Sequence, residues 1–488
     1  MVVPDWLPGI VVVLPLVASV LPIVASLRYD RVGWPIAAVV LTVTLGLAAA
    51  LTVDVLVGSP IRYAIGGVPP RYGVELSGDA FSVVIVLLDL IVATGVLSYT
   101  RTAGPRGNAF YSGYLLLTAS ILGITLAGDL FNLYVFLEIL GISSYALISA
   151  ADSRWSTYAA FKYFLVGTIG ATLYLLGVGY LFLATGTLNM ARVSIRLAEV
   201  GYTDPVVVTA FALTTIGLAI KIALFPLHTW LSDAHSAAPD AVSAIISGLV
   251  PAVAVYAFSR IVFSVYTTDF LAANPAIASG VLYGALLSLL AGNLFALLQR
   301  KVKILLAYST ISQFGLVIVG FAIANETAIF GAIVQLFGHG VVKGGLFILA
   351  GMFALRFDAR TVEEYAGLAN ESPIMGLTFV TLSLTLIGLP PSVGFIGKWY
   401  IVLGAIEEGL WAIAAFVVLS TLMTTTYTLP LINRLYFHPY EGKPPDSTAI
   451  TRGMLLGVAL AAVLGLVLGL LSASLETVLR SAVESLVA

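Results

Sequence analysis

The chain alternates between long apolar stretches and short breaks that contain charged residues, proline or glycine. Fourteen of these stretches approach or exceed the roughly 20 residues that a membrane-spanning helix requires. They lie near residues 9–27, 35–57, 80–100, 110–128, 130–150, 158–184, 205–228, 240–264, 277–298, 304–323, 328–355, 374–404, 410–434 and 453–474. The pattern predicts an all-α, polytopic membrane protein with about fourteen transmembrane helices. Residues 58–79, which include Gly66-Gly67 and Pro69-Pro70, are expected to form an ordered loop or a hairpin.

Two of the stretches are predicted to be broken helices. The seventh stretch includes Phe225-Pro226, and the twelfth includes Gly388-Leu389-Pro390-Pro391. Proline removes a backbone donor, and interrupted helices at corresponding positions of two halves indicate the site of a transporter. The two breaks are five helices apart, which predicts two five-helix repeats, helices 4–8 and 9–13. These repeats would be inverted relative to each other because five is odd.

The domain organisation follows from the same pattern. No polar segment is long enough for a soluble domain, so residues 1–488 are predicted to form a single membrane domain. It is expected to have four parts: N-terminal helices 1–3 (1–109), a first repeat (110–265), a second repeat (277–434), and helix 14 with a short amphipathic tail (453–488).

The composition supports lipid as the solvent and excludes several functions. Apolar residues make up 60% of the chain and charged residues 10%, against roughly 45–50% and about 25% in soluble domains. The net charge of −2 argues against nucleic-acid binding. There is no cysteine, the four histidines form no metal-ligand motif, and no nucleophile–base or nucleotide-loop signature occurs. We therefore predict no metal, no cofactor and no enzyme active site.

Lysines and arginines in the connections predict the orientation, because they are more frequent on the cytoplasmic side. If both termini lie outside, 14 fall in inside loops: Arg28, Arg31, Arg101, Arg106, Arg154, Lys162, Arg300, Lys301, Lys303, Arg356, Arg360, Arg434, Lys443 and Arg452. Six fall outside: Arg62, Arg71, Arg192, Arg196, Arg260 and Arg480. This bias predicts a multi-pass protein of the cell membrane with both termini outside.

Three charged residues of the first half of the chain fall within apolar stretches, where an unpaired charge costs at least about 2.5–3.5 kcal/mol. Glu138 lies in the middle of 130–150, and Lys221 lies one turn before Pro226. A Glu138–Lys221 pair between the fifth and seventh helices would couple the protonation of the two groups, as a gated proton step requires. The alternative is a static ion pair that only fixes packing. Asp89, inside 80–100, has no partner evident from the sequence and no assigned role.

The remaining buried basic residues lie in the second half and around the first break. His339 and Lys343 are spaced i, i+4 and share one helix face, as a proton relay requires; close packing by the flanking glycines is the alternative. Lys398 follows the second break by about two turns and would be the lysine that corresponds to Lys221. His228 and His235 flank the end of the seventh helix. For His228, capping of helix carbonyls is as good an explanation as a relay.

Several motifs resemble those of antiporter-like membrane subunits. Residues 129–138 (DLFNLYVFLE) with 144–147 (SYAL) resemble the helix-5 motif of that family, and residues 221–231 (KIALFPLHTWL) with 233–235 (DAH) and 238–239 (AP) are similar to its helix-7 signature. Residues 306–313 (LAYSTISQ) and 394–398 (GFIGK) also match. The similarity extends from about residue 79 to 435. It is greatest to the D-type subunits of Mrp-type cation/proton antiporters, whose wider family includes proton-pumping subunits of complex I and of membrane-bound hydrogenases.

The resemblance implies a fourteen-helix fold with inverted repeats and assigns roles to the buried residues. Glu138 and Lys221 would be the switching pair, His339 and Lys343 would lie on the central polar axis, and Lys398 would be the terminal lysine. The family usually has a further lysine in helix 8, where this chain has Ala252. Lys221 would then be bridged to the helix-11 pair by His235, Ser243, Ser247 and water, or the path would be interrupted.

The function predicted from these features is proton translocation by an antiporter-like subunit of a multi-subunit Mrp-type assembly. Such a subunit would move protons against Na⁺ and would contact sister antiporter-like subunits, small membrane subunits and the lipid bilayer. The first alternative is the proton-pumping membrane subunit of a complex I-like or hydrogenase-type redox complex. The second is a transport-inactive scaffold, which the absence of the helix-8 lysine favours and the buried charges oppose.

Overall fold

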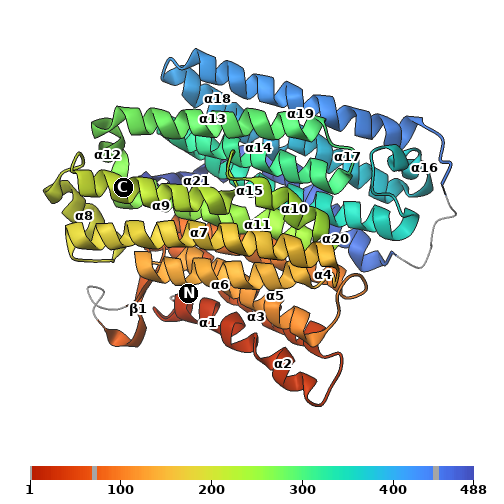
Figure 1. Cartoon of the computed structure of the whole chain (residues 1–488), viewed down its shortest axis with the longest axis horizontal. Helices are drawn as coiled ribbons and strands as arrows, with labels where there is room; N and C mark the ends of the chain where they lie inside the picture. The colour runs from red at the N-terminus through yellow and green to blue at the C-terminus, as the bar shows by residue number, and fades with distance from the viewer. Residues whose placement is uncertain (1–2, 69–73, 443–449, 488) are drawn as a thin grey trace.

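The computed structural model describes residues 3–68, 74–442 and 450–487. Pro69, Pro70, Arg71 and Lys443, on which parts of the loop and orientation predictions rest, lie outside the described residues. The described chain is a bundle of helices that run roughly side by side along one direction (Figure 1). This arrangement agrees with the predicted polytopic, mainly α-helical fold.

The helices of the first half are α1 (Leu7–Ala18), α2 (Leu21–Ser26), α3 (Gly33–Val57), α4 (Ala80–Thr100), α5 (Asn108–Leu126), α6 (Leu130–Ser149), α7 (Arg154–Thr185), α8 (Met190–Val200), α9 (Pro205–Ile222), α10 (Thr229–Ala237), α11 (Asp240–Ser259), the π-helix η2 (Arg260–Tyr266) and α12 (Thr267–Ala273). Those of the second half are α13 (Pro275–Leu297), α14 (Val302–Ile323), α15 (Glu326–Phe357), the 3₁₀ turn η3 (Glu363–Tyr365), α16 (Leu368–Glu371), α17 (Pro373–Ile387), α18 (Val393–Glu407), α19 (Trp411–Phe437), α20 (Arg452–Leu470) and α21 (Ser472–Val487).

Within the described residues, thirteen helical segments are long and apolar enough to cross a membrane. The predicted twelfth helix is not among them, because it is divided into α17 and α18 with 15 residues each. At a rise of 1.5 Å per residue each half spans about 22 Å, which is shorter than the roughly 30 Å hydrocarbon core. The two halves together make the fourteenth crossing. The inverted relation of the two five-helix units stays a prediction.

The connection between α3 and α4 contains the β-structure of the described chain. Strands β1 (Ile61–Ala64) and β2 (Glu75–Gly78) pair antiparallel, with the 3₁₀ turn η1 (Ile65–Gly67) after β1. The prediction of a hairpin is therefore confirmed, and the fold is α-helical apart from this short ribbon. β2 also makes a single bridge from Leu76 to Ala127, which fixes the hairpin against the loop between α5 and α6.

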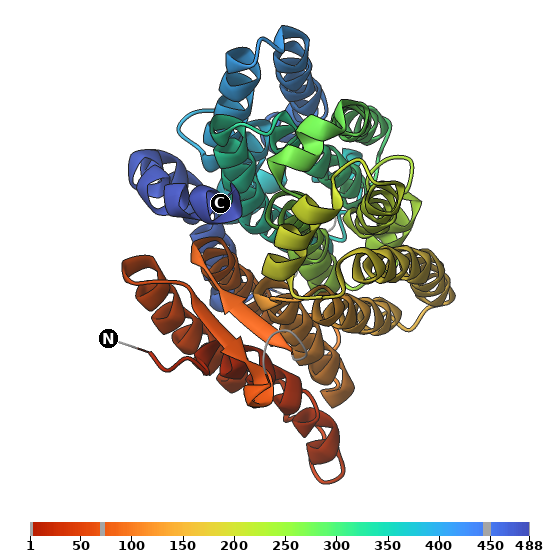
Figure 2. The same cartoon turned by 90° about the vertical axis from the view of Figure 1, so that its left-hand side faces the viewer.

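Helices α11 and α15 lie inside the bundle and carry its polar residues. Viewed along the helices, α1–α3 form one edge, and the other helices surround α11 and α15 (Figure 2). The two central helices approach closely where Gly248 meets Gly340. A Cβ added at Gly248 would lie 3.1 Å from the Gly340 carbonyl oxygen. Glycine at this crossing brings the polar faces of both helices within reach of each other.

The bundle has two ends, and several basic residues that were predicted in loops lie in helices, Arg260, Lys162 and Lys303 among them. The hairpin, α8, α12 and the end of α21 lie at one end, called here the hairpin end; α2, α16 and the start of α20 lie at the opposite end (Figure 1). Arg260 was predicted in an outside loop, but it is buried where α11 continues into η2. Lys162 lies within α7 and Lys303 in the first turn of α14; each forms an ion pair, with Asp233 (2.7 Å) and Asp240 (3.0 Å) respectively.

Candidate functional site

The break after α9 places Lys221 in the protein interior. α9 ends where Ala223 adopts a left-handed conformation, so Lys221 occupies its last turn, with 3% of its surface exposed. The Nε1–H of Trp230 donates to the Ile220 carbonyl (3.0 Å), and the backbone N–H of Phe225 donates to Ser288 Oγ (3.1 Å). Backbone groups freed by the break are thus satisfied by protein, as a membrane interior demands.

The indole of Trp230 supports this break through one hydrogen bond and one ring contact. It stacks on Tyr163 with centroids 3.8 Å apart and planes 3° apart. We expect Trp230→Phe to keep the stack but to remove one of the two donors to the Ile220 carbonyl, which also accepts from the Ala223 backbone N–H at 3.1 Å, at a cost of about 0.5–1.5 kcal/mol. The thermal midpoint of the purified complex in detergent should fall, whereas Trp411→Phe, at an exposed position, should leave it unchanged. Equal midpoints for the two variants would contradict this role.

Glu138 and Lys221 lie on neighbouring turns but do not form the predicted direct ion pair. Lys221 Nζ donates to the Leu137 carbonyl at 3.5 Å, one residue before Glu138. Glu138 Oε1 is buried and has no hydrogen-bond partner among the described residues. The structure therefore does not contain the static Glu138–Lys221 ion pair that was the alternative to a proton switch. A side-chain rearrangement could join the two groups, because Lys221 Nζ already reaches the backbone of the residue next to Glu138.

A line of polar groups follows the interface of α14 and α15. Gln335, His339 and Lys343 are spaced i, i+4, i+8 and lie on one face of α15. Lys343 Nζ donates to the Leu306 carbonyl (2.8 Å) and to Ser309 Oγ. Gln335 Nε2 donates to Gln313 Oε1 at 2.7 Å. We call this set of residues the α14–α15 line.

His339 connects the α14–α15 line to α11. Its Nε2 lies 3.3 Å from the Ser247 carbonyl, and the Ser247 hydroxyl is 2.9 Å from that of Thr310. Its Nδ1 is buried and has no hydrogen-bond partner in the described chain. The ring packs on Phe314 with centroids 4.3 Å apart. His339 thus has one nitrogen engaged and one nitrogen available for a further contact.

His235 is fully buried, and neither ring nitrogen has a hydrogen-bond partner within the described residues. The ring stacks on Phe347 of α15, with centroids 4.7 Å apart. Ser243 was predicted to help to bridge Lys221 to His339 and Lys343. Its hydroxyl donates instead to the backbone carbonyl of His235, at 3.2 Å. An imidazole buried with two free nitrogens is uncommon, because buried polar atoms are normally paired. The position between α10 and α15 suits a group that exchanges partners.

Lys398 is held differently from Lys221. Its Nζ donates to the carbonyls of Leu386 (3.1 Å) and Ile387 (2.7 Å), the last residues of α17. Gly388 follows with a φ of 87°, which ends α17 and lets the chain turn into α18. Lys398 therefore closes its own helix break, whereas Lys221 reaches across to another helix.

Two accessory candidates occupy distinct surroundings. His228 precedes α10 but makes no side-chain capping bond, and its ring packs on Phe225 (5.2 Å) and Phe295 (5.7 Å). The side chain therefore does not cap the start of α10; carbonyl capping and a relay both stay predictions. Asp89, which has no partner evident from the sequence, accepts a hydrogen bond from Thr125 Oγ1 at 3.4 Å.

Several polar contacts near these residues have no clear signal in the sequence. Gln335 could have been found from its i, i−4 spacing to His339. The role of residues 306–313 is now clear: they supply Leu306, Ser309, Thr310 and Gln313 to the α14–α15 line. The ion pairs of Lys162, Lys303 and Arg260 join residues 63 to 181 positions apart, so only the fold brings them together.

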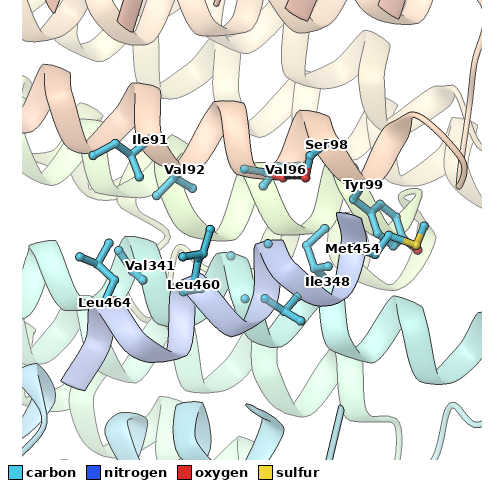
Figure 3. A pocket seen from close by; sticks show the side chains of 16 residues that line it. Ile91, Val92, Val96, Ser98, Tyr99, Val341, Ile348, Met454, Leu460 and Leu464 are labelled. Carbon is cyan, nitrogen blue, oxygen red and sulfur yellow. Dashed lines mark hydrogen bonds between the residues drawn. The ribbon is translucent and has the colours of Figure 1, made fainter. Parts of the chain in front are cut away.

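An apolar cavity lies beside the α14–α15 line without joining it. It has a volume of about 170 Å³ and is lined by residues of α4, α15 and α20, including Val92, Tyr99, Gly344, Ile348 and Leu460 (Figure 3). Its wall is almost entirely aliphatic, so it supplies no proton acceptor. The polar chemistry of the interior therefore lies on the other side of α15, where Lys343 and His339 meet α14 and α11.

The helical bundle, the two broken helices and the buried basic residues define a polytopic membrane protein of the ion-transporter class. Residues 127–424 match the family described as "NADH:quinone oxidoreductase/Mrp antiporter, TM", and the chain belongs to this family. It is an antiporter-like membrane subunit of the Mrp or complex I type.

Relatives of both types cover most of the chain. An NADH-quinone oxidoreductase subunit N of Desulforudis audaxviator is 38% identical over 88% of this chain and 86% of its own length. The D subunit of a Na(+)/H(+) antiporter of Bacillus subtilis is 31% identical over 81% and 80%. These matches agree with the resemblance inferred from the motifs.

Solved structures of two kinds of complex share the fold. A chain of the membrane-bound sulfane sulfur reductase, an archaeal respiratory membrane complex, has a TM-score of 0.91 and 26% identity, covering 98% of this chain and 97% of that one. A chain of the Mrp complex from Dietzia sp. has a TM-score of 0.90 and 25% identity, covering 99% and 97%. Both neighbours are parts of multi-subunit membrane assemblies.

Proposed function

We propose that this chain is the proton-translocating, antiporter-like subunit of a multi-subunit cation/proton antiporter. Protons would move through Glu138, Lys221, His235, His339, Lys343 and Lys398. The observation that carries the proposal is the α14–α15 line, where a buried lysine, a histidine and a glutamine lie on one face of α15 and donors and acceptors of α14 and α11 lie opposite. Ionisable groups within a membrane span are costly and mark ion paths, so their alignment supports transport rather than packing.

The first step of the path is a switch at the α9 break. When Lys221 is protonated it is attracted to Glu138, and when Glu138 takes up a proton the attraction disappears. Among the described residues, the Lys221 ammonium is held only by the Leu137 carbonyl at 3.5 Å, so it is free to leave that contact. Moving between Glu138 and the interior, the Lys221 ammonium would deliver or withdraw positive charge at the start of the central axis.

The second step crosses the position where the family has a lysine and this chain has Ala252. His235 is the group best placed to replace it, because both ring nitrogens lack partners among the described residues and the ring lies against α15. Water would link His235 to Lys221 on one side and to Lys343 on the other. A neutral imidazole accepts a proton at one nitrogen and releases one at the other, so it carries charge without moving far.

The arrangement of the subunit in its membrane is part of the proposal. We place both termini outside, so the hairpin end faces outward and the ion pairs of Lys162 and Lys303 lie inside. The partners are sister antiporter-like subunits and small membrane subunits, the exchanged cation is Na⁺, and the membrane is the cell membrane. The proposal also includes the four predicted parts of the domain, with two inverted repeats at 110–265 and 277–434.

A second candidate function keeps the path and changes its driving force. The 38% identity to an NADH-quinone oxidoreductase subunit N favours a proton-pumping subunit attached to a redox complex. Purification of the native assembly distinguishes the two functions. Co-purifying antiporter subunits would support exchange with Na⁺, whereas co-purifying redox subunits would support the pump.

The proposal is tested by exchange in inverted vesicles that contain the native assembly. We expect Glu138→Ala and Lys221→Ala each to reduce ΔpH-driven cation/proton exchange to a small fraction of the wild-type rate, with assembly intact on a native gel. Glu371→Ala and Lys301→Ala, which remove exposed charges of the same type, should leave exchange unchanged. Full exchange in both assembled test variants would favour the transport-inactive scaffold.

A further inference from the structure

A second line of polar contacts lies at the hairpin end and is not part of the path described above. It borders a cavity of about 430 Å³ between the hairpin, α8, η2 and α21. We call it the hairpin-end cavity; its polar lining includes Glu75, Asp79, Asn189, Arg260 and Ser485. This lining is polar and charged, which distinguishes the hairpin-end cavity from the apolar cavity beside α20.

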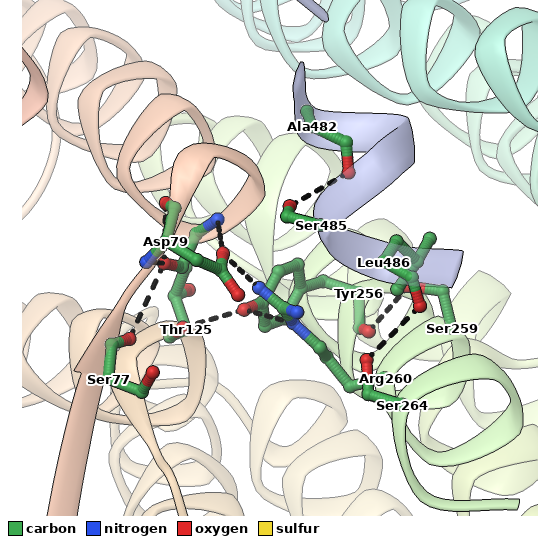
Figure 4. A network of polar contacts seen from close by, with 11 residues as sticks. Ser77, Asp79, Thr125, Tyr256, Ser259, Arg260, Ser264, Ala482, Ser485 and Leu486 are labelled. Carbon is green, nitrogen blue, oxygen red and sulfur yellow. Dashed lines mark hydrogen bonds and ion pairs between the residues drawn. The ribbon is translucent and has the colours of Figure 1, made fainter. Parts of the chain in front are cut away.

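The contacts run from this cavity into the bundle, and Figure 4 shows them as far as Thr125. Asp79 forms an ion pair with Arg260, and Arg260 Nε donates to the Tyr256 hydroxyl at 2.8 Å. The Tyr256 hydroxyl in turn donates to the Thr125 carbonyl at 2.8 Å. The hydroxyl of Thr125 then donates to Asp89 at 3.4 Å. Four helical elements, α4, α5, α11 and η2, contribute to the series.

The series reaches deep into the membrane span. Asp79 caps the start of α4, and Asp89 lies ten residues further along the same helix. At a rise of 1.5 Å per residue, Asp89 lies about 15 Å below the cap, close to the middle of the bilayer core. Thr125 is its one hydrogen-bond partner among the described residues. A carboxyl at that depth without an ion pair is unexplained by packing.

One face of α11 connects this series to the central axis. Gly248, Ala252, Tyr256 and Arg260 are spaced by four residues and so lie in one stripe. Gly248 meets Gly340 of α15 and lies one residue from Ser247, which contacts His339. Ala252 retains 8% exposure, although Val253 and Ala254 next to it retain 1% and 0%. A water-sized probe thus still touches Ala252, which lies one turn from Tyr256 and one turn from Gly248.

We propose that the hairpin-end cavity is a second proton entrance, that the Asp79–Arg260 ion pair is its gate, and that Asp89 is the proton acceptor behind the gate. This inference rests on the proposed function, because it supplies protons to the same central axis. While the ion pair is intact, its two side chains close the inner wall of the cavity and so block the passage inward. Once the pair opens, water beside Ala252 links Asp89 to the cavity.

The structure around Arg260 fits a gate. Arg260 is the first residue of the π-helix η2, and π-helical segments are frequent at functional sites. Its guanidinium lies over the rings of Phe81 and Tyr256, at 5.2 and 5.3 Å from their centroids. Ser264 of η2 donates to the Leu486 carbonyl of α21 at 3.4 Å, so a movement of α21 would reach Arg260 through η2.

Accessibility of a single cysteine tests the gate, because the chain has no cysteine of its own. Ala252→Cys is introduced in the complete assembly in vesicles, and a membrane-impermeant cationic thiol reagent is added on the hairpin side. In the otherwise native chain, we expect the cysteine of Ala252→Cys to be labelled slowly. When Asp79→Asn and Arg260→Gln are added to Ala252→Cys, labelling of that cysteine should be faster by about tenfold or more. Ser77→Cys, in the cavity wall, should label rapidly in both backgrounds. An unchanged rate at Ala252→Cys would overturn the gate.

The role of Asp89 is tested separately by exchange measurements. Asp89→Asn keeps the contact with Thr125 but cannot bind a proton, so exchange should fall at least severalfold, and Asp89→Glu should restore most of it. If Asp89→Asn exchanges normally while Glu138→Ala does not, this inference fails and the proposed function stands. If Glu138→Ala and Asp89→Asn both exchange normally, the proposed function fails as well, and with it the acceptor role.

Discussion

Replacing Lys343 by methionine is expected to abolish proton-coupled exchange while leaving the assembly stable. Lys343 is fully buried, and its ammonium is held by the Leu306 carbonyl and Ser309 hydroxyl, without an acidic partner among the described residues. Methionine has a similar length and no charge, so the cost of holding a charge in the membrane disappears. Loss of a positioned proton-transfer group should reduce the exchange rate by about a hundredfold.

The measurement is ΔpH-driven exchange in vesicles, with assembly assessed by native gel and thermal midpoint. Lys303→Met is the matched control, because it removes a lysine of the same helix bundle whose ion pair with Asp240 is partly exposed. It should retain most of the exchange. A Lys343→Met assembly that exchanges at the control rate would exclude the α14–α15 line from the proton path.

Much of the fold could be predicted from the sequence, because the solvent of this protein is lipid. Apolar stretches long enough to cross the bilayer predicted the helices, and proline predicted both breaks near Pro226 and Pro390. The physical reason is that neither feature depends on distant parts of the chain. The division of the twelfth helix into α17 and α18 was anticipated, but the length of each half was not.

The site could be predicted only in part, because a sequence shows spacing along one helix but not contacts between helices. His339 and Lys343 were found from their i, i+4 spacing. Their partners Ser309 and Ser247, on α14 and α11, follow from the packing of three helices. The contact that Lys221 makes with the Leu137 carbonyl could not be predicted for the same reason, since it depends on how α6 and α9 pack; the Glu138–Lys221 pair stays a prediction.

Arg260 is the clearest case of a residue misassigned by its sequence position. It lies near the end of the apolar stretch 240–264, where a loop charge is ordinary, and its partner Asp79 lies 181 residues earlier. The structure places it inside a continuous helical segment between α11 and α12. Two polar lines thus lie next to the same helix, one through Ser247 and one through Tyr256. The face of α11 between them is occupied by Ala252, a small residue that leaves space.

The second large effect is expected from leaving Arg260 without its counter-ion. Asp79→Asn keeps the hydrogen bond that caps α4, since asparagine is an equally good capping residue, but it removes the charge opposite Arg260. The side chains of Arg260 and Asp79 are only 10% and 16% exposed. Removing one partner of such a pair should cost about 3–5 kcal/mol, because a buried charge is left uncompensated.

Arg260→Gln combined with Asp79→Asn is expected to recover most of that loss. The second substitution removes the unpaired charge, and the glutamine amide can still donate to the Tyr256 hydroxyl. Thermal unfolding of the purified assembly would be compared for the wild type, the two single variants and the double variant, so that the coupling between the two sites is measured directly. If the double variant were as unstable as the sum of the single variants, the pair would contribute no coupling energy. The contacts with Phe81 and Tyr256, and not the ion pair with Asp79, would then hold Arg260 in place. An ion pair that contributes no free energy could not act as a gate at the hairpin end.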